Sequence, residues 1–226
     1  VELQHPFTSA YARFHAGLLR LWRRDAEAAH HLALELLEVA EEHGFRIWTA
    51  AGSCLLGAAR VGLGRFADGL ADIAAGMDLY RELRSPPIFW PFLLFVNARA
   101  SHAAGRPADG LRLLDGAIEI LGADNTMSPE LHLLKGDLLA AIAADDASRI
   151  SDAEPWYRLA FDRAGELNAR MPQLRAATRL GRLRLVEGKP DAATEILGPV
   201  YATFTEGFAT VDLLEARDVL DARGAP

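Results

Sequence analysis

The chain has 226 residues and a formal net charge of −7 at pH 7. Alanine and leucine supply about a third of it, whereas valine and isoleucine together number only 16, too few β-branched residues for a substantial sheet. Half of the residues are hydrophobic, which excludes a disordered chain and predicts a large buried core in an all-α fold. The acidic balance and the lack of a long basic run in the sequence argue against nucleic acid as a partner of this segment.

Cysteine content and hydropathy indicate the compartment. The single cysteine, Cys54, excludes an internal disulfide. The sequence holds no run of 18 uncharged apolar residues and no basic-apolar leader, so we expect neither membrane insertion nor secretion. A cytoplasmic protein is therefore expected. The first residue, Val1, is typical of a segment cut from a longer protein.

Self-similar motifs recur along the chain and join pairs of segments with helical apolar periodicity. Each motif has a basic residue, a turn or cap residue and a small, acidic helix start, at residues 24–28, 65–69, 106–110 and 189–193. Small residues precede these motifs at one register, and one more fills the gap before the last: Ala16, Gly57, Ala98, Gly136 and Gly181. Their spacings of 41, 41, 38 and 45 residues predict stacked helical hairpins, because a glycine inside a helix is tolerated where two helices approach closely.

The pattern resembles tetratricopeptide repeats with a longer period, and predicts eleven helices. First helices of the hairpins are expected at 7–22, 46–63, 87–104, 128–144 and 170–187, second helices at 25–43, 66–83, 107–121, 152–168 and 190–204, and one more helix at 210–223. Four glycines are expected to end helices (Gly44, Gly64, Gly105, Gly188), and four prolines to lie in first turns (Pro87, Pro107, Pro129, Pro190). Residues 145–151 are predicted to form the one lengthened hairpin loop.

We therefore predict a right-handed superhelical solenoid of about five hairpins in a single domain, residues 1–226. Its repeats are placed at 6–44, 45–84, 86–122, 127–168 and 169–204, with a capping helix at 205–223 that covers the last apolar edge. The apolar side of that helix is assigned to Phe208, Val211, Leu214 and Val219, and its water-facing side to Glu206, Asp212, Glu215, Arg217 and Asp218.

Several C-terminal motifs resemble the tail of a family of large bacterial signalling proteins: LRAAT at 174–178, LGPVY at 197–201 and FTEGF at 204–208. The resemblance extends upstream through LLKGD at 133–137, GRPADGLRLL at 105–114 and HPF at 5–7. Proteins of that family carry a nucleotide-cyclase or winged-helix domain, a P-loop ATPase domain and a C-terminal tetratricopeptide array. The resemblance implies that this chain is the sensor and interaction arm of such a protein. The chain contains neither a Walker-type loop nor a cyclase segment, so those activities are not carried over.

The concave face of such a solenoid is lined by its first helices and is where these proteins bind. Register places aromatic residues in the N-terminal half of this groove and charged residues in its C-terminal half: Trp48, Phe92, Phe95, Arg99, Glu130, Asp137, Arg175 and Arg182. The row Arg99, Asp137 and Arg182 is expected to hold one carboxylate between two guanidiniums and to receive an acidic group. The alternative is that the aromatic residues only fill space and the charges only pair with each other.

The residues offer no constellation for catalysis, cofactor binding or metal binding. None of the seven histidines has the spacing that aims two imidazoles at one ion, since His30 and His31 are adjacent and diverge by about 100°. Two hypotheses stay open. Either the segment is a non-catalytic sensory module that binds a protein, peptide or small effector and signals to upstream domains of its own polypeptide, or it is a structural arm that forms homo-oligomers and binds no ligand.

Overall fold

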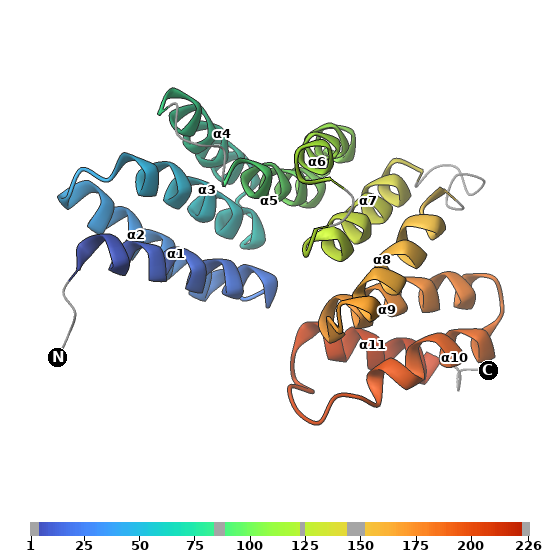
Figure 1. The fold of residues 1–226 in the computed structure, drawn as a ribbon. Coiled ribbons are helices and arrows are strands. Elements are labelled where there is room, and N and C mark those ends of the chain that lie inside the picture. Colours follow the sequence, from blue (N-terminus) through green and yellow to red (C-terminus); the bar gives the residue numbers. More distant parts are fainter. Residues whose placement is uncertain (1–4, 84–88, 123–124, 144–151, 223–226) are drawn as a thin grey trace. The chain divides into compact units, whose positions relative to one another are not determined.

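The computed structural model describes residues 5–83, 89–122, 125–143 and 152–222, and these form eleven α-helices and no strand (Figure 1). The helices are α1 (Pro6–Trp22), α2 (Ala26–Glu42), α3 (Arg46–Gly62), α4 (Phe66–Glu82), α5 (Trp90–Ala103), α6 (Pro107–Leu121), α7 (Ser128–Ile142), α8 (Glu154–Glu166), α9 (Arg170–Val186), α10 (Pro190–Tyr201) and α11 (Val211–Asp221). The all-α repeat architecture predicted from the sequence is confirmed. Its superhelical handedness stays a prediction.

Helix boundaries follow the predicted punctuation. Helix α10 ends at Tyr201, three residues before the predicted end, and α5 begins at Trp90. Pro87 and the predicted long loop at 145–151 lie outside the described residues. The predicted prolines at 107, 129 and 190 do occupy first turns, where the backbone N–H that proline lacks has no helical partner.

Helix-ending turns share one backbone conformation. The four predicted glycine stops all have positive φ, between 65° and 79°: Gly44, Gly64, Gly105 and Gly188. Arg24 and Asn168 have positive φ of 61° and 53° after α1 and α8, although neither is a glycine. Left-handed residues close the helix end by directing the chain back, so the same turn recurs whether or not glycine is available.

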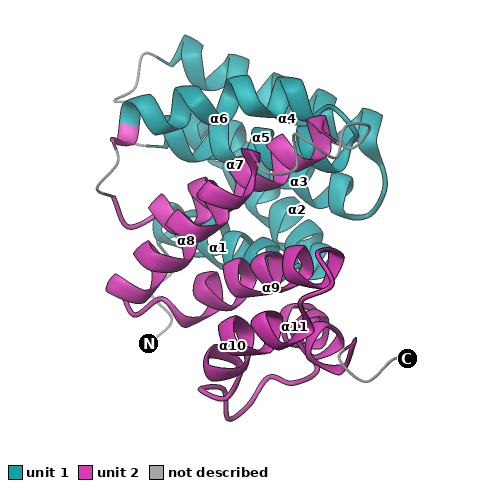
Figure 2. Ribbon diagram, turned by 90° about the vertical axis from the view of Figure 1, so that its right-hand side faces the viewer, with its two compact units in different colours: residues 1–120 teal, residues 121–226 magenta. Residues whose placement is uncertain are grey.

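The chain divides into two compact units, residues 1–120 and 121–226, drawn in teal and magenta in Figure 2. In unit 1, α1 contacts α2 and α3, and α3 contacts α4 and α5. In unit 2, α7 contacts α8 and α9, and α9 contacts α10 and α11. The first helix of a hairpin thus packs on its own partner and on the next first helix, which is how stacked repeats bury a continuous core.

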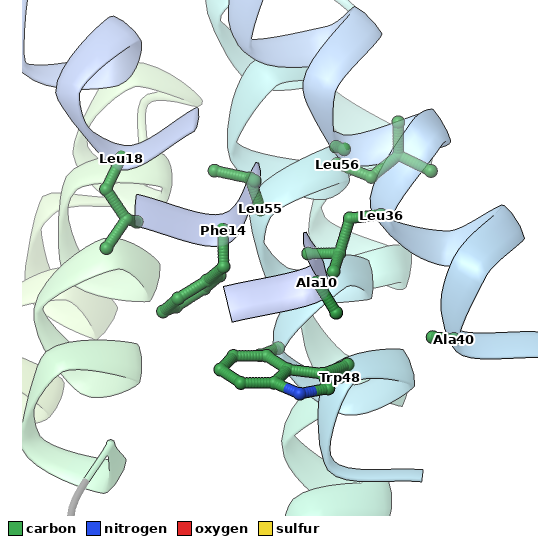
Figure 3. Packing of buried hydrophobic residues seen from close by; sticks show 10 residues of the cluster. Ala10, Phe14, Leu18, Leu36, Ala40, Trp48, Leu55 and Leu56 are labelled. Carbon is green, nitrogen blue, oxygen red and sulfur yellow. The ribbon is translucent and has the colours of Figure 1, made fainter. Parts of the chain in front are cut away.

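The core of unit 1 is built around aromatic rings between first helices. Phe14 of α1 and Trp48 of α3 are each 1 % exposed, and their ring centroids lie 5.7 Å apart. Figure 3 shows the Phe14 ring above that of Trp48, with Ala10 beside the indole. Leu36 of α2 is fully buried against the same cluster. Apolar area removed from water holds these helices together.

Helices α3 and α4 approach each other backbone to backbone. A Cβ added to Gly57 would lie 2.4 Å from the carbonyl oxygen of Gly69, and one added to Gly69 would lie 2.5 Å from the carbonyl oxygen of Gly57. A Cβ at Gly76 would meet the carbonyl of Ala50 at 2.6 Å. The predicted close approach at Gly57 is therefore confirmed, and it extends along α4 at seven-residue spacing.

Other small residues of the predicted register serve different neighbours. Gly136 faces its own hairpin partner α8, because a Cβ there would lie 2.4 Å from the ring of Tyr157. Gly181 instead faces α11, with Val219 Cγ1 at 3.0 Å and the nearest atom of α10 at 3.8 Å. In the first hairpin Ala16 is half-buried, and the adjacent Gly17 packs on Leu55 of α3. Close approach to the hairpin partner, predicted at all five small residues, is found at Gly57 and Gly136; Gly181 meets α10 at ordinary contact distance and lies nearer to α11, and the contacts at Ala16 and Ala98 stay predictions.

Helix α11 covers the end of unit 2, but with a different face from the one predicted. Leu213, Ala216 and Val219 are buried against Leu174 and Ala177 of α9. The set assigned to the apolar side is wrong in part, because Phe208 and Val211 are 44 % and 40 % exposed; Asp212 and Glu215, assigned to water, instead face α9. In this rotation Leu213, Ala216 and Val219 are buried while Asp212 and Glu215 reach the arginines of α9.

Among the described residues, no helix combines the length and the apolar character needed to cross a bilayer.

Candidate functional site

Seven charged side chains of unit 2 form two neighbouring groups of ion pairs along one helix, α9, and we call them together the charged seam. It comprises Arg175, Arg179 and Arg182 of α9, Glu130 and Asp137 of α7, and Asp212 and Glu215 of α11. The arginines stand four and three residues apart and so share one face of α9. Acids from the helices on either side converge on that face.

Arg175 is the buried centre of the seam. Its Nη1 donates to Glu130 Oε1 and its Nη2 to Asp212 Oδ2, both at 2.8 Å, and the three side chains are only 13 %, 16 % and 8 % exposed. Burial alone would lower the pKa of Arg175, but the hydrogen bonds and charges of Asp212 and Glu130 outweigh it and raise that pKa. The charges are therefore mutually satisfied inside unit 2.

Arg179 holds Asp137 in a two-pronged pair. Its Nε donates to Oδ1 at 2.8 Å and its Nη2 to Oδ2 at 3.2 Å, and the Tyr157 hydroxyl donates to the same Oδ1 at 3.0 Å. Burial and the Asp137 charge raise the pKa of Tyr157, so the hydroxyl keeps its proton and remains a donor. The missing side chain of Gly136 lets the Tyr157 ring cross α7 and reach this carboxylate.

Arg182 lies at the exposed end of the seam. Its Nη2 donates to Glu215 Oε2 at 3.2 Å, and Arg179 approaches the same oxygen at 3.6 Å. The Arg182 side chain is 45 % exposed, so this pair contributes little. Asp137 is thus held by Arg179, and the predicted pairing of Asp137 with Arg182 is wrong. Arg99 belongs to unit 1, and its predicted pairing with Asp137 stays a prediction.

The balance of charge in the seam differs from the expected one. Four carboxylates surround three guanidiniums, so the formal charge is negative and not positive. Arg175 and Arg182 were expected to bind carboxylates of a ligand. In the structure they bind carboxylates of α11 in the same chain, Asp212 and Glu215.

The aromatic candidates lie in unit 1 and are mostly core. Trp48 and Phe95 are 1 % and 2 % exposed, and Phe92 is half-buried between the rings of Trp22 and Phe95. The guanidinium carbon of Arg99 stands 6.0 Å from the Phe95 ring centroid, within reach of a cation–π contact. Trp48 and Phe95 are thus core residues, and whether these positions also serve a binding groove stays a prediction. The concave groove itself stays a prediction.

Two rings on α1 are exposed where the core aromatics are not. Phe7 and Tyr11 are 42 % and 49 % exposed, and their ring centroids lie 5.4 and 5.9 Å from that of Trp48 in edge-to-face contacts. His15 stacks on Tyr11 at 4.0 Å. We call Phe7 and Tyr11 the ring pair; they stand one helical turn apart on a rigid, buried base.

Sequence reasoning missed Arg179, Asp212, Glu215, Tyr157 and the ring pair as site residues. The sequence held a signal for the seam. Helix α9 carries Arg175, Arg179 and Arg182 on one face, at i, i+4 and i+7, and it contains no acidic residue. Such a helix needs acids from its neighbours. Which helices supply them depends on the stacking order and not on local sequence.

Other reactive side chains are not arranged for chemistry. Burial raises the pKa of the Cys54 thiol to about 12, so it stays protonated and is a poor nucleophile. His132 is 7 % exposed, and burial, followed by the charges of Arg163 and Lys135, lowers its pKa. The described part of the chain holds no group of three or more histidine, cysteine or acidic residues suited to a metal ion.

Comparison with solved structures shows what this helix arrangement is similar to. A variant of a Podosopora anserina protein, named for a kinesin light chain with nearly identical TPR-like repeats, superposes with a TM-score of 0.58 at 13 % identity over 89 % of this chain and 96 % of that one. A second structure of that description gives a TM-score of 0.55 at 12 % identity over 99 % and 100 % of the two chains. The fold is a TPR-like repeat.

The likeness extends to fold alone, because 12–13 % identity carries no residue-level correspondence. No family model matches the sequence, and no curated protein matches it either.

Proposed function

We propose that this chain is a non-catalytic protein-interaction module that engages its partner on the first helices of its hairpins. One observation carries the proposal: the ring pair leaves nearly half of two aromatic side chains exposed on a base of buried rings. Aromatic side chains anchored in this way dominate binding energy at protein interfaces, because they bury a large area with few rotatable bonds. An apolar segment of a protein or peptide is the partner that such rings fit.

The charged seam is not part of this proposed site. Its arginines are engaged by carboxylates of the same unit, with Arg175 buried between two of them. A ligand that reached these guanidiniums would first have to displace an acid of the chain, whereas Phe7 and Tyr11 present ring surface without any displacement. The proposed groove of first helices, with Trp48, Phe92 and Phe95 beneath it, therefore opens to a partner on α1.

The sequence motifs shared with bacterial cyclase and ATPase signalling proteins suggest the setting. We propose that the chain is the C-terminal arm of such a regulator, and that binding at the ring pair is relayed to upstream domains of the same polypeptide in the cytoplasm. The support is the resemblance of the motifs at 133–137, 174–178 and 204–208. A small effector in place of a peptide is the further possibility within this setting.

Site-specific photo-crosslinking tests the proposal. Tyr11 is replaced by a photoreactive phenylalanine analogue in the intact parent polypeptide, and the matched control carries the analogue at Val186, which is 83 % exposed on α9 of unit 2. We expect covalent adducts with a defined protein segment from position 11 and only diffuse background from position 186. Equal yields from both positions would contradict a binding site on α1.

The alternative function, a structural arm that forms homo-oligomers, is favoured by the seam. Charges that pair within the unit are what architecture needs, and they leave α9 without a ligand role in this conformation. Sedimentation velocity of the chain discriminates the two functions. A concentration-dependent dimer that persists after Phe7→Ser and Tyr11→Ser would support the structural arm and not the ring-pair site.

A further inference from the structure

Helix α11 contacts α9 in the manner of a bound peptide helix. Two acids one turn apart, Asp212 and Glu215, pair with the arginines of α9, and the apolar side chains of Leu213, Ala216 and Val219 lie buried beside them. Anchors at i, i+1, i+3, i+4 and i+7 are the pattern by which an amphipathic helix fills a groove between two others. The helix therefore has both the charged and the apolar side chains by which a peptide helix would bind α9.

The connection of α11 to the rest of unit 2 is slight. Residues 202–209, which join it to α10, are exposed except for Phe204, and Phe208 among them is 44 % exposed. Gly207 has a φ of 78°, a left-handed position within this connection. Helices of α11's eleven residues are marginal in isolation, so its helical state depends on contact with α9 and α10.

Position in the repeat order explains why α9 offers this surface. Each first helix of the unit packs on the next one, and α11 takes the place next to α9 where a further first helix would pack. Arg217 and Asp218 on its outer side are exposed. Local opening of α11 thus disturbs one face of unit 2 and leaves the packing of α7 to α10 in place.

We propose that the arginine face of α9 is a docking site for an acidic amphipathic helix of a partner protein, and that α11 occupies it in cis until such a helix replaces it. The inference goes beyond the proposed function, which places a partner on α1 of unit 1. The occupant is a helix with two carboxylates three residues apart and apolar residues on the same side, in the pattern D-L-x-E-A-x-x-V that α11 has at residues 212–219.

The arginines of α9 favour an acidic helix as the partner. Arginine forks bind two carboxylate oxygens at once, as Arg179 does with Asp137. Without α11 the seam loses Asp212 and Glu215 and keeps Glu130 and Asp137, so its three guanidiniums outnumber its remaining carboxylates by one. A basic helix would be repelled there, and an uncharged one would not replace the carboxylates that α11 supplies to Arg175 and Arg182.

A peptide of residues 207–222, labelled with a fluorophore, tests the proposal on the full 226-residue chain. The variant Asp212→Asn with Glu215→Gln weakens the cis helix without changing α9, and Asp218→Asn with Asp221→Asn removes the same charge from the outer side of α11 as the matched control. We expect the first variant to bind the peptide at least tenfold more tightly than the wild type or the control does. A peptide with arginine at both acid positions should not bind.

A second variant keeps the test decisive if the first disturbs the fold. Val219→Ala loosens α11 through its apolar contact with Gly181 and leaves every charge in place. Amide hydrogen exchange must show α11 opening in either variant while α7 to α9 stay protected. Failure of the opened chain to bind the peptide, or equal binding of the charge-reversed peptide, would overturn the proposal. Neither result bears on crosslinking at Tyr11, so the two proposals fail separately.

Discussion

The two units build the same repeat with different material between neighbouring first helices. In unit 1 the space between α1, α3 and α5 is filled by rings, with Phe14, Trp48 and Phe89 within 6 Å of one another by centroid distance. In unit 2 the space between α7, α9 and α11 holds the charged seam, with Arg175 at its buried centre. The same helix spacing therefore tolerates a packed aromatic layer and a paired ionic layer.

This difference predicts which kind of substitution destabilises each unit. Ring contacts are short-ranged and only weakly directional, so unit 1 depends on volume and on the close approach of α3 to α4. Ion pairs are directional and cost desolvation, so unit 2 depends on each acid having its arginine. Substitutions in one unit should consequently act by size, and substitutions in the other by charge.

The largest effect is expected from Arg175→Ala. It leaves Glu130 and Asp212 buried without a guanidinium, and loss of one partner of a buried pair typically costs about 3 to 5 kcal/mol. Urea unfolding read with amide hydrogen exchange should show this loss in unit 2 alone.

A matched exposed pair serves as control for that substitution. Arg158→Ala breaks the pair with Glu154 on the surface of α8, where about 0.5 kcal/mol or less is expected. Replacing the buried triad by Arg175→Met, Glu130→Leu and Asp212→Leu should recover much of the stability lost in Arg175→Ala. Equal losses in Arg158→Ala and Arg175→Ala would mean that the seam is not a buried ionic layer.

Size should decide in unit 1. Gly57→Leu drives a side chain into the Gly69 carbonyl and should separate α3 from α4, with overpacking of about 1 to 3 kcal/mol or more. Gly116→Ala is the control, because the nearest atom to its added Cβ lies at 3.7 Å, so it should be neutral or stabilising. Calorimetric melting of both variants checks this, and an unchanged melting temperature in Gly57→Leu would refute the close approach.

Acidification should weaken unit 2 through His132. Its pKa in the fold is lowered by burial and by Arg163 and Lys135, so the unfolded chain binds the extra proton more readily. Its contribution is complete above the unfolded pKa of about 6.5 and is lost as pH falls, at no more than about 1.4 kcal/mol per pH unit. Urea midpoints between pH 7.5 and 5.5 should fall in the wild type, and His132→Phe should flatten that fall.

Among the arginines of the charged seam, the smallest effect is expected from Arg182→Ala. The side chain is 45 % exposed, and Glu215 keeps its approach from Arg179, so the cost should be about 1 kcal/mol or less and should shrink with added salt. Chemical denaturation at low and high ionic strength measures it. A loss of stability as large as that of Arg175→Ala would contradict the expectation that buried pairs of the seam contribute more than exposed ones.

Periodicity and punctuation were enough to predict the helices. Alanine and leucine at helical spacing, with glycine after and proline inside the ends, placed α9 at 170–187 against the observed Arg170–Val186. These signals are local, since caps and turns act within a few residues of the helix end. The small residue Gly57 also marked its contact correctly, because it lies within one hairpin.

Contacts between hairpins were beyond the sequence. Arg182 was chosen for Asp137 by register, yet the structure uses Arg179, one turn earlier on the same face of α9. The rotation of α11 was likewise misjudged, because its amphipathic pattern allows more than one face to turn inward. The hydrophobic pattern predicts that Val211 lies in the core, whereas the structure exposes Val211 and buries Asp212 against the Arg175 guanidinium. An apolar pattern does not take account of such an ion pair.

The sequence by itself determined an all-α chain of hairpins, their boundaries and the small residues at which helices meet, because periodicity, caps and turns are properties of neighbouring residues. Only the tertiary structure decided that the space between first helices holds rings in unit 1 and ion pairs in unit 2, and that α11 supplies acids to α9. Those choices depend on how far each helix is rotated against the next, and that rotation is set jointly by apolar burial and charge pairing across the stack.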